Sequence, residues 1–350
     1  MSRIASPSQF IKPAQAALIR QRAFEAEKSG QLHPDQLSLI YAERWFKLFV
    51  PASSHGLELS LPEGLRIQEA LAWADGPTGW TVTLCSGANW FIGFFQAGIA
   101  EALFRNEKVC LAGSGMATGV ASLSGNGYEV TGSWRYATGA PHASAFTANC
   151  IIEKDGIVQR NPDGSPEVRP FLFLRDDVEI QDDWKAFGMI ATASWRFEVR
   201  NLKVRRDRCF VIDGLMALLP QPIYQFPFDP FAVATLAVNC SGMAFRFLEL
   251  CREGIGQDAT SRLDAAREMF YDCIESAWEA LMRHKQIPEE TLSNITRLSR
   301  SLAAKALQVT DELFPYCGML AADSGSEINR VWRNLHTASL HNLLFNRVAG

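Results

Sequence analysis

The chain has 350 residues, of which 47% are hydrophobic and 21% are charged, and its formal net charge is −4. This composition is typical of a globular protein with two or three domains and a sizeable hydrophobic core. The small excess of negative charge excludes a strong electrostatic attraction to nucleic acid or to an anionic membrane, so neither is predicted as a partner.

Helices are predicted throughout the first hundred residues. One begins at Pro13 and stops at Gly30, because proline is favoured in the first turn of a helix and glycine just beyond the last. Apolar residues recur at helical spacing after Pro34, which predicts a second helix. Ser60 is placed to cap a third helix that begins at Pro62.

A long apolar segment, residues 80–104, follows these helices. Its length would suit a membrane span, but Ser86, Asn89 and Gln96 lie inside it, and each would be costly in hydrocarbon. No basic flank sets an orientation, and the N-terminal residues lack the apolar core of a signal peptide. The segment therefore predicts a buried core helix, and the protein is expected in the cytoplasm, away from membranes.

From Lys108 the apolar residues alternate, and glycine, threonine and valine become frequent. The turn cluster SGNG at residues 124–127 separates two alternating segments, which predicts a β-hairpin. Further strands are predicted at residues 145–152, 169–174 and 195–199. The section that ends near Asp213 is therefore expected to be a small β-barrel or sandwich.

The helical period returns after Pro220 and continues to the end of the chain. Three long amphipathic helices are predicted at residues 230–253, 258–286 and 288–314, and a shorter one at 327–346. Short connections between them predict a four-helix bundle. The chain is thus predicted to be α+β, with an N-terminal helical domain (1–107), a central β-domain (108–215) and a C-terminal bundle (216–350).

The eight cysteines are scattered singly along the chain. None forms a CxxC pair, and none lies beside a histidine at metal-ligand spacing. We therefore expect free thiols in a reducing compartment and no metal site.

Three stretches carry a resemblance to a known family. They are the glycine-rich residues 111–145, residues 183–204 with the pattern W-x-x-x-G-M-x-x-T-x-S, and residues 328–341 on the last predicted helix. In this order, and within this helix–strand–helix arrangement, they resemble the acyl-CoA dehydrogenase superfamily over nearly the whole chain. The resemblance implies the acyl-CoA dehydrogenase-like fold and a flavin bound between the β-domain and the bundle.

Within the superfamily the closer likeness is to the flavin-dependent monooxygenases, which include the oxygenase components that hydroxylate phenols and the dibenzothiophene monooxygenase. Their pattern G-x-W-x-[YF]-[AS]-[ST]-G-x-x-H-A is matched from Gly132 to Ala143, and W-R-[DN]-x-x-T-x-x-x-H from Trp332 to His341. The resemblance implies an oxygenase component that takes reduced FAD or FMN from a separate reductase. With O₂ it would oxidise a small or carrier-bound organic substrate, as a homotetramer or homodimer.

The resemblance assigns the chemistry to Thr138 and His341. Thr138 corresponds to a hydroxyl near the flavin N5, and His341 to a histidine beside flavin and substrate that deprotonates a phenol or holds the oxygenated flavin. Arg333, Thr337 and His341 follow at i, i+4 and i+8, so we expect them on one face of the last helix. The alternatives are that Thr138 is an ordinary residue of a β-strand and that His341 has a structural role.

Further contacts to the flavin are expected from the β-domain and the last helix. Trp134 either stacks on the flavin ring or fills the β-domain. Close backbone approach is expected at Gly139, Gly113 and Ser114, since glycine removes the obstacle of a side chain. Arg333 is expected to pair with the flavin pyrophosphate or with an acid of a partner subunit, and Thr337 to face the cofactor.

The substrate pocket is expected around Asn89, Trp90 and Asp229. Acyl-CoA dehydrogenases need a carboxylate base, and Asn342 stands in the stretch where many carry glutamate. Asp229 is the remaining base, or else a helix N-cap. Ala88 precedes Asn89 where many phenol-oxidising relatives carry a histidine. Desaturation of an acyl thioester and a flavin-binding protein without turnover are therefore kept as alternatives to oxygenation.

Overall fold

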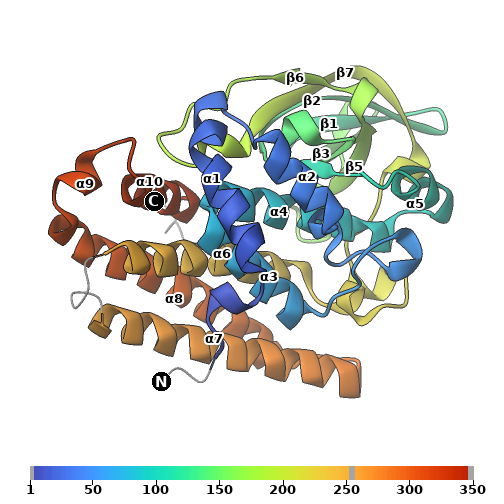
Figure 1. The fold of residues 1–350 in the computed structure, drawn as a ribbon. Helices are drawn as coiled ribbons and strands as arrows, with labels where there is room; N and C mark the ends of the chain where they lie inside the picture. The colour runs from blue at the N-terminus through green and yellow to red at the C-terminus, as the bar shows by residue number, and fades with distance from the viewer. Residues whose placement is uncertain (1–3, 252–256, 346–350) are drawn as a thin grey trace.

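The computed structural model describes residues 4–251 and 257–345. Figure 1 shows a β-sheet at one side of the molecule, long helices packed beneath it, and the N-terminal helices crossing in front. This order of helices, strands and helices is the predicted α+β architecture, and the fold-class prediction is confirmed.

The N-terminal part contains five α-helices, and local sequence explains where several begin. They are α1 (Pro13–Ser29), α2 (Pro34–Ala42), α3 (Leu61–Ala74), α4 (Gly76–Asn89) and α5 (Ala97–Phe104). Ser60 caps α3 as expected, and Glu63 reaches back to the Ser60 N–H in a capping box. Asp75 caps α4 by accepting from the backbone N–H of Thr78 at 3.0 Å.

The prediction of one buried helix over residues 80–104 is wrong in its second half. α4 ends at Asn89, and the chain continues as a 3-10 helix, η4 (Trp90–Phe94), before α5. The break lies where Gly93 packs on the ring of Tyr224 so closely that a Cβ would be 2.3 Å from it. In α5 only Phe104 is buried, so within the predicted segment 80–104 the buried core helix is the part that belongs to α4.

The central part is a seven-stranded mixed sheet in the order β4-β3-β1-β2-β7-β6, with β5 paired to β3. The strands are β1 (Leu111–Ser124), β2 (Gly127–Ala137), β3 (Ala145–Lys154), β4 (Ile157–Val158), β5 (Val168–Leu174), β6 (Glu179–Gln181) and β7 (Trp195–Arg205). β1 and β2 form the predicted hairpin, with Ser124 opposite Gly127. β1 and β3 run parallel, and their register shifts between Ser114 and Gly119.

The C-terminal part contains α6 (Phe228–Leu250), α7 (Gln257–His284), α8 (Glu289–Leu313), the short α9 (Met319–Ala322) and α10 (Glu327–Ser339). The last helix is shorter than predicted, because the chain turns at Leu340; residues 252–253 and 346 of the predicted helices lie outside the described residues. α6 is long and apolar enough to cross a membrane, yet 78% of its most apolar window is buried inside the protein.

Two hydrophobic cores organise the molecule. One is formed by helices of both the N-terminal and the C-terminal part, and the other lies within the sheet around Trp134 and Phe197. The helices before and after the sheet therefore share a single core, with the β-part attached to it through α4 and the loops near the ends of β2 and β7. This arrangement places the three stretches that carry the family resemblance around α4.

Candidate functional site

α4 runs through the middle of the molecule and has one side that is only partly covered. All of its residues are buried except Leu84 and Gly87, and Phe91 in the next turn is also half-exposed. A Cβ added at Gly87 would meet no heavy atom within 4 Å. Trp80, Leu84 and Gly87 are spaced by four and three residues, so they follow one side of α4, and Phe91 follows in η4. This side of α4 is apolar and is partly exposed at Leu84 and Gly87.

The end of β2 packs directly against α4. Gly139 adopts a φ of 75°, and a Cβ there would lie 2.9 Å from the Cys85 sulfur. Its N–H donates to the Thr192 carbonyl at 2.9 Å. Glycine is needed here both for the backbone conformation and for the close approach. Gly139 therefore serves contacts within the chain.

A row of buried hydroxyl groups connects this strand end to the loop before β7. Thr138 Oγ1 lies 2.8 Å from Ser194 Oγ, and Ser194 Oγ lies 2.7 Å from Thr192 Oγ1. The Thr192 hydroxyl donates to the Met189 carbonyl at 2.8 Å. Thr138 is thus more than a strand residue with a free hydroxyl, since it belongs to a chain of hydrogen bonds.

The same loop is held by α10. Asn334 Oδ1 accepts the Met189 N–H at 2.6 Å. A Cβ on Gly188 would lie 2.1 Å from the Arg333 carbonyl oxygen, so only glycine permits this approach. The three stretches that carry the family resemblance are therefore brought together by α4, the hydroxyl row and Asn334.

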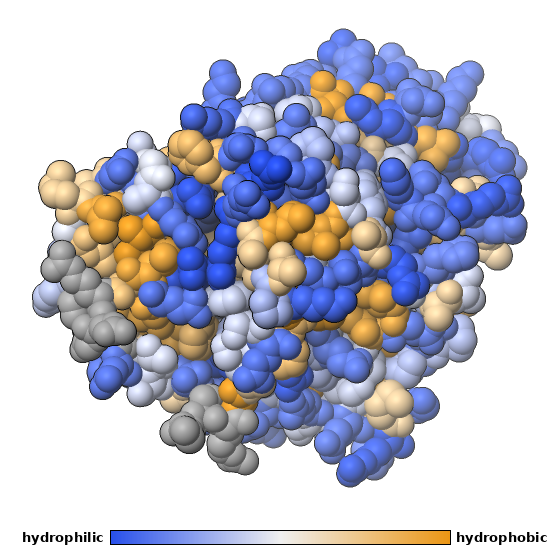
Figure 2. All heavy atoms as spheres, viewed as in Figure 1, coloured by the Kyte–Doolittle hydropathy of each residue, from blue (hydrophilic) through white to orange (hydrophobic). Residues whose placement is uncertain are grey.

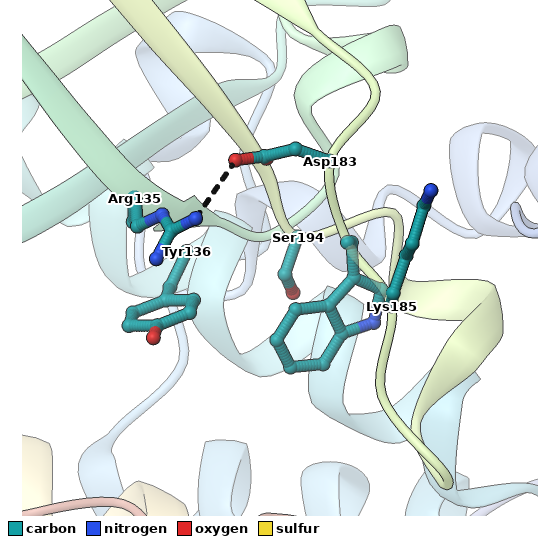
Figure 3. Close-up of a pocket in the computed structure, with 6 residues that line it drawn as sticks. Arg135, Tyr136, Asp183, Lys185 and Ser194 are labelled. Carbon is teal, nitrogen blue, oxygen red and sulfur yellow. Dashed lines mark ion pairs between the residues drawn. The ribbon is translucent and has the colours of Figure 1, made fainter.

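A cavity of about 340 Å³ opens on the outer side of this junction. Figure 3 shows Tyr136 beside Ser194, with Arg135, Asp183 and Lys185 around them. Trp184 also lines the cavity, and its ring meets the Tyr136 ring edge-on with 5.9 Å between centroids. Tyr136 has a φ of 69° and is 56% exposed. A bulky residue with positive φ and an exposed ring is uncommon, and such strain concentrates at functional sites.

The rim of this cavity combines opposite charges. Arg135 lies 3.6 Å from Asp183, which also receives two hydrogen bonds from the Arg196 guanidinium at 2.8 and 2.9 Å. Burial alone would raise the pKa of Asp183, but the hydrogen bonds and charges of these arginines lower it below the usual value. Asp183 therefore stays ionised and holds both guanidinium groups in place.

Sequence reasoning missed four of the residues that line this cavity and could take part in binding. They are Tyr136, Asp183, Trp184 and Ser194. A signal was available, because three of them occupy fixed positions of the two family patterns: Tyr136 in the first, Trp184 and Ser194 in the second. No pattern position corresponds to Asp183, whose role follows only from the folded geometry.

His341 lies near α4 but not on α10. The helix ends at Ser339, so the expected single face with Arg333 and Thr337 is wrong. The imidazole contacts the Trp80 ring edge-on, with 6.0 Å between centroids. Burial lowers the pKa of His341 to about 4. Its Nδ1 accepts the Leu343 N–H at 3.3 Å, so the neutral ring carries its proton on Nε2.

Trp134 fills the β-part. It is fully buried, stacks on Phe197 at 5.2 Å, and donates its indole N–H to the Asn149 carbonyl at 2.9 Å. A Cβ on Gly119 or Gly132 would collide with its ring. Of the two interpretations offered for Trp134, the geometry favours core packing, because neither ring face is free for stacking on a flavin.

Gly113 and Ser114 lie near the start of β1. A Cβ on Gly113 would be 2.4 Å from the Thr147 hydroxyl of β3, so this glycine serves strand packing. Ser114 is half-buried and accepts the Met116 N–H at 3.4 Å. Both residues are partly exposed, and the expected flavin contacts at Gly113 and Ser114 stay predictions.

Arg333 and Thr337 are engaged within the chain. Arg333 pairs with Glu27 of α1 at 2.7 Å and donates to the Phe187 carbonyl at 2.6 Å. The Thr337 hydroxyl donates to the Arg333 carbonyl at 2.9 Å. In this structure the Arg333 charge is paired with Glu27, and its expected pairing with a pyrophosphate or a partner subunit stays a prediction.

The three expected substrate-pocket residues lie at the far end of α4. Asn89 is fully buried, donating to the Phe46 carbonyl at 2.7 Å and accepting the Leu111 N–H at 3.1 Å, so it joins helices to the sheet. Trp90 and Asp229 line a second, larger hollow of about 1250 Å³. Asp229 is exposed in the first turn of α6 and does not cap it.

Comparisons with known proteins agree with this geometry. Residues 255–345 match the family described as acyl-CoA dehydrogenase, C-terminal domain. The chain is 23% identical to the oxygenase subunit HsaA of a flavin-dependent monooxygenase from Rhodococcus jostii, over 92% of this chain and 91% of the relative. It is 24% identical to indole-3-acetate monooxygenase from Pseudomonas putida, over 92% and 86%.

Solved structures show the same fold. The HsaA monooxygenase from M. tuberculosis superimposes with a TM-score of 0.86 at 25% identity, over 94% of this chain and 91% of that one. XiaF from Streptomyces sp., in complex with FADH2 and glycerol, has a TM-score of 0.82 at 19% identity, over 97% and 91%. The chain therefore has the acyl-CoA dehydrogenase-like fold, and the relatives that it resembles in sequence are oxygenase components of flavin-dependent monooxygenases. The predictions of a flavin cofactor and of a flavin-dependent oxidoreductase are confirmed at this level.

Proposed function

We propose that this chain is the oxygenase component of a two-component flavin-dependent monooxygenase. It receives reduced FMN or FAD from a separate reductase and uses O₂ to oxidise a small or carrier-bound organic molecule. The observation that carries the proposal is the convergence of Thr138, Ser194 and Asn334 beside the partly exposed apolar side of α4. A polar row next to an apolar wall suits a flavin on one side and a substrate on the other.

The flavin is assigned to the cavity beside Tyr136. Tyr136, Trp184 and Ser194 all line this cavity, and the two rings meet edge-on with 5.9 Å between centroids. The lining thus offers aromatic surface and a hydroxyl group to a planar heterocycle with polar edges. Lys185 lies at the rim and supplies positive charge for a phosphate group, whereas Arg135 is already paired with Asp183. A bound reduced flavin supplies the electrons that activate O₂, and the protein supplies orientation and exclusion of water.

The substrate is assigned to the apolar wall of α4, the side that is only partly covered. Trp80, Leu84 and Phe91 make this wall apolar, and Gly87 leaves room at its centre. His341 borders the wall through its contact with Trp80. Because its Nδ1 is occupied and its pKa lies near 4, His341 presents an Nε2–H donor at neutral pH. It therefore orients an oxygen atom by donating a hydrogen bond.

Desaturation of an acyl thioester is the second candidate, and the position of Asp229 disfavours it. Asp229 is exposed beside Trp90 at the C-terminal end of α4, whereas His341 contacts Trp80 near its start. Ten residues of helix separate these two tryptophans, which is about 15 Å. The Asp229 carboxylate is therefore too far from the end of α4 that borders the row of hydroxyl groups to act there as the base.

A reductase and a second copy of the chain are the proposed protein partners, and the cytoplasm is the proposed location. Large apolar side chains are exposed near α9 and α10, including Met319, Leu320 and Leu340. Figure 2 shows hydrophobic surface over this end of the helical part. Exposed patches of this kind mark interaction sites, so we assign this end to contacts between copies.

The test is a single-turnover experiment. Protein mixed anaerobically with reduced FMN, or separately with reduced FAD, is exposed to ¹⁸O₂ in the presence of phenols, indoles and aromatic sulfides. Incorporation of ¹⁸O into a product supports the proposal. Formation of hydrogen peroxide alone across the whole panel contradicts it. Anaerobic reduction of the oxidised flavin by acyl-CoA substrates would instead support desaturation.

A further inference from the structure

The hydroxyl row between β2 and the loop before β7 has a fixed direction. It starts at the Met189 carbonyl, continues through Thr192 and Ser194, and ends at Thr138, with oxygen–oxygen distances of 2.8, 2.7 and 2.8 Å. All three hydroxyl-bearing residues are buried. Each hydroxyl has one proton and two lone pairs, so the protons in the row can be counted.

The carbonyl end decides the direction. A carbonyl oxygen has no proton, and a contact of 2.8 Å between two oxygens is attractive only when one of them donates, so Thr192 donates to Met189. Thr192 then has no proton left, and Ser194 must donate to Thr192. By the same reasoning Thr138 must donate to Ser194. Every hydroxyl proton of the row is thus consumed inside the protein.

This direction determines what the cavity offers to a ligand. Ser194 lines the cavity together with Tyr136 and Trp184, and Figure 3 shows it beside Tyr136. With its proton committed to Thr192, Ser194 presents only a lone pair, and Thr138 at the end of the row does the same. A ligand atom that meets either oxygen must therefore be a hydrogen-bond donor.

Reduced and oxidised flavins differ in this property. The N5 atom of reduced flavin carries a hydrogen, whereas N5 of oxidised flavin has only a lone pair. We propose, on the basis of the function proposed above, that Met189, Thr192 and Ser194 form a positioning relay that makes the site selective for reduced flavin. The relay acts by preventing Thr138 and Ser194 from donating. With oxidised flavin, a lone pair of the Thr138 or Ser194 oxygen would face the lone pair of N5, and no hydrogen bond would form.

Anaerobic titrations of the full chain with oxidised and reduced FMN, and in parallel with FAD, test the relay. Thr192→Val removes the acceptor of Ser194 and frees its proton. The ratio of the dissociation constants for oxidised and reduced flavin is expected to fall by about tenfold, the equivalent of one hydrogen bond. The midpoint potential of the bound flavin should fall with it. Ser194→Ala, which frees the Thr138 proton, should act in the same direction.

Two further variants make the result decisive. Thr138→Ser keeps the row intact and should retain the wild-type ratio. Thr310→Val removes a buried hydroxyl that donates within α8, and should leave the ratio unchanged. An unchanged ratio in both Thr192→Val and Ser194→Ala, with flavin still bound, overturns the relay but not the proposed function. Absence of binding of either flavin form to the wild-type chain overturns both.

Discussion

Asn334 of α10 accepts the backbone N–H of Met189 at 2.6 Å, although 145 residues separate the two in the sequence. Asn334 is almost fully buried, and its Cβ also borders Gly76 at the start of α4. One side chain thus fixes the last helix, the central helix and the loop that carries Thr192 and Ser194. The geometry of the cavity depends on this contact.

Replacement of Asn334 tests that dependence. Asn334→Ala leaves the Met189 N–H buried without an acceptor, which should lower the free energy of unfolding by about 1–3 kcal/mol and weaken flavin binding. Asn334→Asp restores an acceptor oxygen, so its flavin affinity should lie closer to wild type. Urea denaturation and flavin titration measure both effects. Equal flavin affinity in the alanine variant and the wild type would show that the loop is held in place without Asn334.

Trp134 and Tyr136 form a matched pair for separating packing from binding. Trp134→Ala should lower the free energy of unfolding by roughly 3–5 kcal/mol, because it leaves a cavity in the sheet core, while the folded fraction keeps its affinity for flavin. Tyr136→Ala removes an exposed ring, so stability should change by less than about 0.5 kcal/mol. Its flavin dissociation constant should instead rise several-fold. The opposite pattern would assign stacking on the flavin to Trp134.

Gly87 tests the position of the substrate. Gly87→Leu fills the open centre of the α4 wall with a side chain that favours helix, so folding should be unaffected. Binding of a two-ring probe such as 4-phenylphenol to the flavin-loaded protein should weaken by at least about tenfold, and that of phenol much less. Gly98→Leu in the exposed helix α5 is the control, since it also meets no neighbouring atom. If both variants bind the probes as the wild type does, the substrate lies elsewhere.

The secondary structure could be predicted from sequence because it depends on local patterns. The alternation around Ser124 to Gly127 specified the hairpin, and Ser60 specified a helix start. The break after Asn89 could not be predicted, since the 3-10 helix that follows packs through Gly93 against Tyr224, 131 positions away. Local periodicity contains no information about such a contact.

Family patterns predicted Thr138 and His341 as site residues, and their roles stay a prediction. Both lie around α4, and the patterns did not show which neighbours each contacts. Trp134 and Arg333 look functional in the sequence because aromatic and cationic residues suit a flavin. In the fold the Trp134 ring stacks on Phe197, and the Arg333 guanidinium pairs with Glu27. Whether a side chain is free for a ligand depends on tertiary contacts, which a single sequence does not contain.

Two half-buried histidines, His142 and His341, should make stability depend on pH. Burial lowers the pKa of both His341 and His142 to about 4, and His142 Nε2 has no hydrogen-bond partner among the described residues. In the unfolded chain a histidine has a pKa near 6.5, so the unfolded state binds more protons between pH 6.5 and 4. The stabilisation is therefore complete above about pH 6.5 and is lost as the pH falls towards 4.

Urea denaturation of the flavin-free protein between pH 7 and pH 4.5 measures this effect. Each histidine can account for at most about 3 kcal/mol of the loss on acidification, from a pKa difference of two to three units. His341→Gln and His142→Gln should each make the pH dependence shallower, whereas His284→Gln, at the exposed end of α7, should leave it unchanged. A His341→Gln variant with the wild-type pH dependence would mean that His341 is not held neutral by burial. It would then be available in its charged form, and its assignment as an Nε2–H donor from the neutral ring would have to be abandoned.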